Sequence, residues 1–192
     1  MSLSYAVPVR GKPGCPCDAE WIPAFEEELL EQGIIDKPLT IAQLIGMASA
    51  SAQVHSRGGA GDVWETDERI SYVARQMGAV SWPRVTGSFA NNRHTHWVLI
   101  GCPHLHQQGR DQIAEAYAGG DGLLGDVPDN SALHAALWPK RTWRQGIAWH
   151  REQQLRRRRI VKLEVARARK AKWQRWVQRA NKNIARLRAQ TK

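Results

Sequence analysis

Residues 54–62 read VHSRGGAGD, and this stretch is the most informative one for the fold. A histidine at position 55 and an aspartate at position 62 are separated mainly by three glycines and an alanine. Because ordering glycine costs backbone entropy, so rich a run indicates a tight turn, a close backbone approach or a flexible tether. We expect the glycines to let the chain fold back, so that His55 and Asp62 converge.

The charge of the chain is unevenly distributed. The chain has 192 residues, of which 42% are hydrophobic, which fits one ordinary domain with an appendage. Residues 151–192 hold sixteen Lys or Arg and two Glu, a net charge of +14 within a total of +10, which leaves 1–150 at −4. We therefore expect an extended arm over 1–20, a mildly acidic domain over 21–150 and a basic amphipathic helical tail over 151–192.

Targeting segments are not expected. No stretch approaches the roughly 18 apolar residues that a membrane span needs. The N-terminal residues MSLSYAVPVRGKPG lack the apolar core of a signal peptide. The sequence predicts neither a membrane span nor a signal peptide.

The three cysteines, Cys15, Cys17 and Cys102, are too few and too odd in number for a disulfide framework. Cys15 and Cys17 offer half of a metal site, but no second cysteine pair completes it, so we favour reduced thiols in a loop. The stretch CPHLH at 102–106 also alternates ligand types. Its proline and the following turn favour a loop at the end of a strand over a second metal site.

Apolar spacing and capping residues predict a mixed α and β chain. Asp67 or Thr66 is placed to cap a helix that Gly78 would end. Helices are expected over 21–33, 66–78 and 109–120, and strands over 37–46, 79–85 and 95–101, the last two as neighbours in one sheet. A turn-forming stretch at 121–130 and a connector over 131–149 follow, and Trp138, Trp143 and Trp149 are expected to pack on the domain.

The pattern changes at about residue 150. Apolar residues recur there at spacings of three and four, with Lys170 as the exception, on a helix otherwise covered by Arg and Lys. A helix of about 40 residues would extend about 60 Å. We expect it to bind other proteins, a second copy or nucleic acid; a solvated, partly disordered end is the alternative, which the tryptophans oppose. The residues expected to bind partners are Trp173, Trp176, Val177, Ile184 and Leu187.

A His-x-His pair lies in the RHTHW stretch at 93–97. Side chains two apart on a strand point to the same face, so His94 and His96 are expected to face one cleft together. A catalytic zinc ion needs about three protein ligands and one open position, and His55, Asp62 and His96 supply that set. Zinc would lower the pKa of its water toward about 7 and polarise a carbonyl, while His94 handles protons and steadies the oxyanion.

The two motifs also resemble a known family. SAQVHSRGGAGD, followed about thirty residues later by HTH, resembles the S-x-x-x-H-x-x-G-x-A-x-D and H-x-H motifs of the D-Ala-D-Ala carboxypeptidase, lysostaphin and hedgehog group of zinc proteins. The similarity is to an actinobacterial and actinophage branch and covers about residues 38–130. It implies an α+β fold, with a small antiparallel sheet flanked by helices, and zinc bound by His55, Asp62 and His96. It further implies hydrolysis of peptide bonds next to D-amino acids in the bacterial wall.

One departure from that family concerns the general base. Many members of the carboxypeptidase group place a glutamate shortly before the last zinc histidine, whereas residues 89–93 here read FANNR. Either His94 takes the role, or the site binds metal and catalyses poorly. Glu65 is an alternative base, while Asp67 is better explained as a helix cap.

The sequence therefore predicts a zinc-dependent peptidoglycan peptidase, acting as a carboxypeptidase or an endopeptidase. Arg57 and Trp97 are the residues expected to bind substrate. The phage-like resemblance and the long basic helix suggest a component of the virion, in the phage tail or another part of the particle, that opens the wall during entry. Two alternatives remain: a structural virion protein with an inactive peptidase fold, and a nucleic-acid-binding protein that acts through its basic tail.

Overall fold

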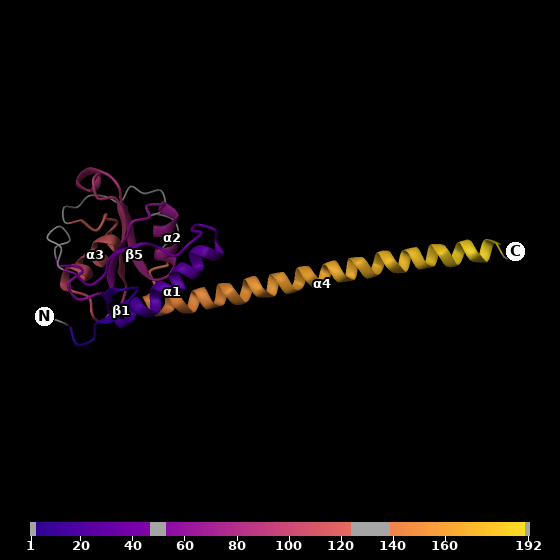
Figure 1. The fold of residues 1–192 in the computed structure, drawn as a ribbon, viewed down its shortest axis with the longest axis horizontal. Helices are drawn as coiled ribbons and strands as arrows, with labels where there is room; N and C mark the ends of the chain where they lie inside the picture. The colour runs from indigo at the N-terminus through magenta and orange to yellow at the C-terminus, as the bar shows by residue number, and fades with distance from the viewer. Residues whose placement is uncertain (1–2, 47–52, 124–138, 191–192) are drawn as a thin grey trace. The chain divides into compact units, whose positions relative to one another are not determined.

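The residues that the structure describes fold into two small antiparallel sheets, flanking helices and one long C-terminal helix (Figure 1). The computed structural model describes residues 3–46, 53–123 and 139–190. Two compact units are present, Met1–His150 and Arg151–Lys192. The predicted α+β class with a small antiparallel sheet and a long C-terminal helix is confirmed.

The N-terminal segment is not an extended arm. Two short strands, β1 (Val7–Val9) and β2 (Lys12–Gly14), form an antiparallel hairpin that leads into helix α1 (Pro16–Glu31). The helix begins earlier than predicted because Pro16 suits a first helical position and the Cys15 N–H donates to Asp18 Oδ2 at 2.9 Å. The arm predicted over 1–20 is therefore wrong, and Cys15 and Cys17 are buried parts of the folded unit.

The main sheet has four antiparallel strands in the order β3-β4-β6-β5. Their bounds are Ile41–Gln43 for β3, Ala60–Val63 for β4, Ala79–Arg84 for β5 and His94–Leu99 for β6. The predicted strands correspond to β3, β5 and β6, and the expected pairing of β5 with β6 is confirmed. Strand β4 was not predicted because it has only four residues, and glycine and aspartate are poor strand formers.

Helices cover both faces of this sheet. Helix α2 (Glu68–Gln76) is capped by Asp67, as predicted, and α3 (Gln107–Ala118) follows β6 after a loop. Trp97 of β6 packs against Trp21 and Phe25 of α1. Figure 1 shows α1 and α2 on one side of β5 and α3 on the other.

Helix α4 (Trp143–Gln190) has 48 residues and begins inside the stretch predicted to be a connector. Its first turns belong to the folded unit: Trp143 is buried, and Trp149 packs against the core, as expected. A Cβ added at Gly146 would lie 1.7 Å from the Met77 carbonyl oxygen, so the helix and the end of α2 are in backbone contact. Trp138 and residues 124–130 of the predicted turn lie outside the described residues.

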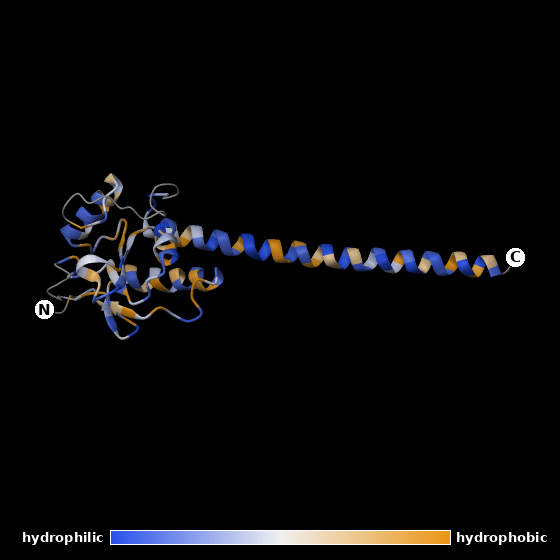
Figure 2. Cartoon of the chain, turned by 90° about the horizontal axis from the view of Figure 1, so that it is seen from above, coloured by the Kyte–Doolittle hydropathy of each residue, from blue (hydrophilic) through white to orange (hydrophobic). Residues whose placement is uncertain are grey.

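Beyond His150, α4 is largely exposed and predominantly hydrophilic, with scattered apolar residues (Figure 2). Trp173 and Trp176 are 63% and 66% exposed. Within 3–46, 53–123 and 139–190, no helix combines the length and the apolar character needed to cross a membrane.

Candidate metal centre

Strands β4 and β6 bring together the central residues of the centre. Asp62 on β4 is the direct register partner of His96 on β6. Neighbouring side chains on β6 alternate between faces, so His94 and His96 share the face opposite Trp97. The expectation that these two histidines look the same way is confirmed by their contacts with one carboxylate.

The loop before β4 carries His55 toward Asp62. Its glycines adopt the left-handed conformation, with φ of +91° at Gly58 and +76° at Gly59. His55 Nε2 lies 3.3 Å from Asp62 Oδ2, so the predicted convergence across the glycine run is present. The glycines also permit a close approach, because a Cβ at Gly59 would lie 2.6 Å from the Cys102 sulfur.

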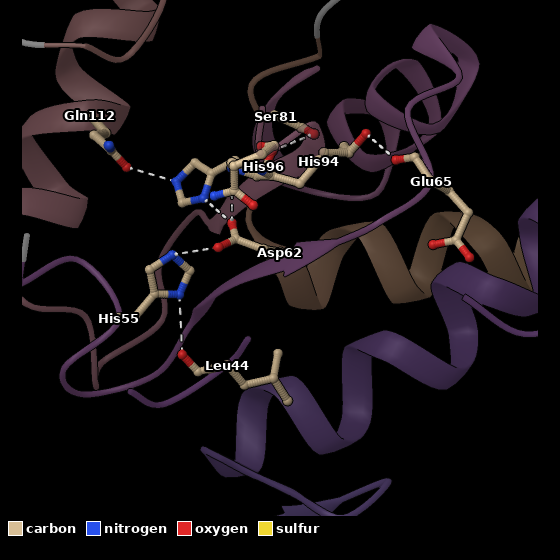
Figure 3. A network of polar contacts seen from close by, with 10 residues as sticks. Leu44, His55, Asp62, Glu65, Ser81, His94, His96 and Gln112 are labelled. Carbon is tan, nitrogen blue, oxygen red and sulfur yellow. Dashed lines mark hydrogen bonds and ion pairs between the residues drawn. The ribbon is translucent and has the colours of Figure 1, made fainter. Parts of the chain in front are cut away.

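Asp62 stands at the middle of the cluster (Figure 3). His96 Nδ1 lies 2.7 Å from Asp62 Oδ1, and His94 Nε2 lies 3.9 Å from the same oxygen. One donor atom from each of His55, Asp62 and His96 falls within 4.8 Å of the others, as the ligands of a single ion would. The three residues are 1%, 9% and 5% exposed, so the cluster is nearly closed to solvent.

Backbone carbonyls orient two of the histidines. The Nδ1–H groups of His55 and His94 donate to the carbonyls of Leu44, at 3.1 Å, and Asn92, at 2.6 Å. Since a carbonyl oxygen only accepts, the proton lies on Nδ1 in both rings. In both rings this leaves Nε2 directed toward Asp62, and the bond from Nδ1 to a carbonyl is the type of outer contact that fixes metal-binding histidines.

Burial and charge set the protonation of the cluster. Burial lowers the pKa of His55 to about 4, although the charge of Asp62 acts in the opposite direction. The lowered pKa keeps the His55 ring neutral. Burial raises the pKa of Asp62, but hydrogen bonding and charge from His96, with smaller effects of His55 and His94, outweigh it and lower the pKa overall. A neutral imidazole and an ionised carboxylate are the forms that bind a divalent cation.

Glu65 does not face this centre. Its carboxylate accepts the Thr40 N–H at 3.0 and 3.1 Å, and its backbone carbonyl accepts the Thr95 hydroxyl at 2.7 Å. Figure 3 shows the carboxylate turned away from Asp62. His94 is therefore the better placed of the two predicted bases.

The two residues predicted to bind substrate differ. Trp97 is 1% exposed and packs on the far face of β6, so its prediction is wrong: alternation along the strand turns it into the core. Arg57 is exposed on the loop beside His55, and its role in binding substrate stays a prediction.

Sequence reasoning missed the role of Gln112. This residue of α3 places Oε1 3.0 Å from His96 Nε2, on the side of the ring away from Asp62. Nothing in the local sequence marks it, because the contact depends on how α3 packs over the sheet.

The two short cysteine-containing stretches, at 15–17 and 102–106, lie together in the fold. Cys15 and Cys17 are at the start of α1, and Cys102 and His104 are in the loop after β6; the four form one group of potential metal ligands. His106 is not part of it, because its side chain caps α3.

Comparison of the chain with known protein families, with characterised proteins and with solved structures finds no match. A functional assignment therefore starts from the residues and geometry of the two clusters.

Proposed function

We propose that this protein is a zinc-dependent hydrolase that cleaves peptide bonds in peptidoglycan, as a carboxypeptidase or an endopeptidase. One observation carries the proposal: His55, Asp62 and His96 converge from a loop and two strands, with His94 Nε2 directed to the same carboxylate. Three ligands and an adjacent base are the composition of a catalytic rather than a structural zinc site. The substrate class rests on the resemblance of the two motifs to D-Ala-D-Ala carboxypeptidase-like proteins.

The residues fit such an ion. A bound zinc ion would supply Lewis-acid polarisation of a carbonyl and lower the pKa of a water molecule. His55 offers a lone pair fixed by its bond to Leu44, and Asp62 offers an ionised carboxylate. The bond from His94 Nδ1 to the Asn92 carbonyl leaves Nε2 as the ring nitrogen placed to take a proton from water and return it to the leaving amine.

The proposal assigns the tail to attachment. Residues 151–192 carry a net charge of +14, and Trp173 and Trp176 are exposed on that helix. We propose that the helix binds other virion proteins of complementary negative charge and places the hydrolase at the wall. Removal of 151–192 should leave hydrolysis of soluble wall peptides intact; a steeply salt-dependent DNA affinity lost by that removal would instead favour a nucleic-acid-binding function.

The test combines metal analysis with turnover. His96→Ala should lose about one zinc ion per chain and abolish cleavage of purified wall peptides, because a ligand is removed. His106→Asn is the matched control, since it changes a histidine outside the cluster and keeps a side chain able to cap α3. A zinc content that does not change in His96→Ala contradicts the site, and undiminished cleavage contradicts the mechanism.

The position of Glu65 favours a second candidate function, a structural virion component that keeps the metal without the chemistry. The Glu65 carboxylate accepts the Thr40 N–H instead of facing the centre. Among the described residues, Asp62 is the one carboxylate that lies in the cluster with His55 and His96. Stoichiometric zinc lost in His96→Ala, with no turnover on wall peptides of several cross-link types, would support this function over the hydrolase.

A further inference from the structure

A second group of donor atoms lies outside the centre described above. Cys15 precedes the first turn of α1, and Cys17 lies within that turn. Cys102 and His104 follow β6 across the sequence, in the loop that leads to α3. One donor atom of each of the four lies within 4.8 Å of the others, so the fold assembles a Cys-x-Cys and a Cys-x-His pair into one cluster.

Three of the six separations between these atoms match the edges of a tetrahedral zinc site. Zinc binds sulfur at about 2.3 Å and histidine nitrogen at about 2.0–2.1 Å, which gives tetrahedral edges of about 3.8 Å between sulfurs and about 3.6 Å between sulfur and nitrogen. The Cys15 and Cys102 sulfurs are 3.7 Å apart. The sulfurs of Cys17 and Cys102 lie 3.7 and 3.8 Å from His104 Nδ1. The other three separations are at most 4.8 Å, so all four atoms lie close enough to converge on one ion.

The surroundings favour a closed site. Cys15, Cys17 and Cys102 are 0%, 3% and 4% exposed, and all three are free thiols. A sulfur separation of 3.7 Å is far from the roughly 2.05 Å of a disulfide. Three sulfurs and one imidazole also complete the four ligands of a structural zinc ion without leaving a position for water.

Neighbouring groups hold the ligands in place. The Tyr5 ring lies against the His104 ring, with centroids 4.3 Å apart, and the Tyr5 hydroxyl donates to the Arg57 carbonyl. Asp18 Oδ2 accepts the N–H groups of Cys15 and Gly59 at 2.9 and 3.1 Å. Through Arg57 and Gly59 respectively, Tyr5 and Asp18 thus join the cysteine cluster to the loop between His55 and Asp62.

We propose a structural zinc site whose four ligands are Cys15, Cys17, Cys102 and His104. The ion ties the start of α1 to the loop after β6, and it stiffens the loop on which His55 approaches Asp62. Binding requires thiolates, so the cysteines release their protons as the ion enters. The site does not depend on catalysis at the first cluster.

The full chain, purified with reduced thiols, should contain about two zinc ions, one for each cluster. Titration with an organomercurial should release one of them in step with modification of the cysteines. Replacement by Co²⁺ should give an intense sulfur-to-cobalt charge-transfer band, which only thiolate ligation produces. These measurements use the wild-type chain and do not require that any variant fold.

Variants separate the two sites. Cys102→Ser should lose one zinc ion and with it the charge-transfer band, while His104→Cys should keep the ion and strengthen the band, because it offers a fourth sulfur. His96→Ala should lose the other ion and keep the band, and His106→Asn should keep both. A wild-type chain with three reduced cysteines and no charge-transfer band overturns the proposal, whether or not the protein hydrolyses wall peptides.

Discussion

The two donor clusters of the folded unit differ in what they leave open. His55, Asp62 and His96 supply three ligands and stand beside a fourth histidine, His94, whose Nε2 is directed toward the same carboxylate. The cysteine cluster supplies four ligands, three of them nearly inaccessible to solvent. The number of donors therefore separates a centre suited to reaction from one suited to cross-linking.

The same loop contacts both clusters. Gly58 and Gly59 lie between His55 and Asp62 in sequence, and a Cβ on either would meet Cys15 or Cys102 within 2.8 Å. The glycines are therefore needed for more than chain reversal, since they let the backbone pass next to the side chains of Cys15 and Cys102. Damage to this loop should affect the two clusters together, whereas damage to one ligand set should not.

The largest expected effect is on turnover. His94→Ala should lower kcat by about 10²–10⁴-fold, because the residue accepts and returns the proton without binding the ion. Zinc content should stay unchanged, which distinguishes His94 from the ligands. Rates on wall peptides and metal analysis of the same preparation check this, with the exposed neighbour Arg93→Ala as control. Loss of zinc in His94→Ala would move this residue into the ligand set and break the contrast between three donors and four.

A methyl group on the shared loop should give the next effect. Gly59→Ala should lower the free energy of unfolding by about 2–4 kcal/mol, because φ is +76° and the new Cβ would lie 2.6 Å from the Cys102 sulfur. Zinc content should fall at both clusters. Gly87→Ala is the matched control, since φ is +59° and nothing lies within 4 Å of its Cβ. Equal unfolding midpoints in denaturant for the two variants would show that the close approach of residue 59 to Cys102 does not affect stability.

A second His–carboxylate group, around His150, sharpens the contrast, because its histidine is paired directly with two glutamates. The His150 ring donates from Nδ1 to Glu28 at 2.6 Å and from Nε2 to Glu27 at 3.1 Å, and Glu31 is close by. Burial lowers the pKa of His150, but the hydrogen bonds and charges of Glu28 and Glu27 outweigh it, so the pKa is raised above 6.5. The contact fastens the first turns of α4 to α1.

The pH dependence follows from that raised pKa. A group with a higher pKa in the folded state stabilises the fold fully below its unfolded pKa, near 6.5, and loses that contribution as the pH rises through the folded value. His150→Gln should cost about 1–3 kcal/mol at about pH 6 and less at about pH 9. Denaturant unfolding of both proteins at the two pH values checks this. A cost that grows with pH would contradict the ion pair.

Much of the fold was predictable, because local rules decide it. The Asp67 cap, the apolar face of α2 and the pairing of β5 with β6 all follow from neighbouring residues. Helix α1 starts earlier than expected since the cap at Cys15 involves Asp18, and a cysteine at that position is an uncommon helix signal. Strand β4 is visible only in its pairing, because its own residues disfavour a strand.

The two clusters were not equally predictable. His55, Asp62 and His96 form two motifs whose combined spacing pointed to one ion, and the fold brings them together. The cysteine cluster joins residues 15–17 with residues 102–104, and each pair alone is too weak a pattern. Only tertiary packing of the start of α1 against the loop after β6 unites them, as it alone places Gln112 beside His96.

The smallest expected effect on the folded unit comes from the tail. Trp173→Ala with Trp176→Ala should change its free energy of unfolding by less than about 0.5 kcal/mol, because both side chains are more than 60% exposed. Zinc content and hydrolysis of soluble peptides should also stay the same, since neither cluster draws a ligand from 151–190. In sedimentation experiments with acidic partner proteins, the double variant should associate with them more weakly than the unchanged chain does. A loss of metal in this double variant would contradict the prediction, because it would show that the tail affects metal binding at one of the two clusters.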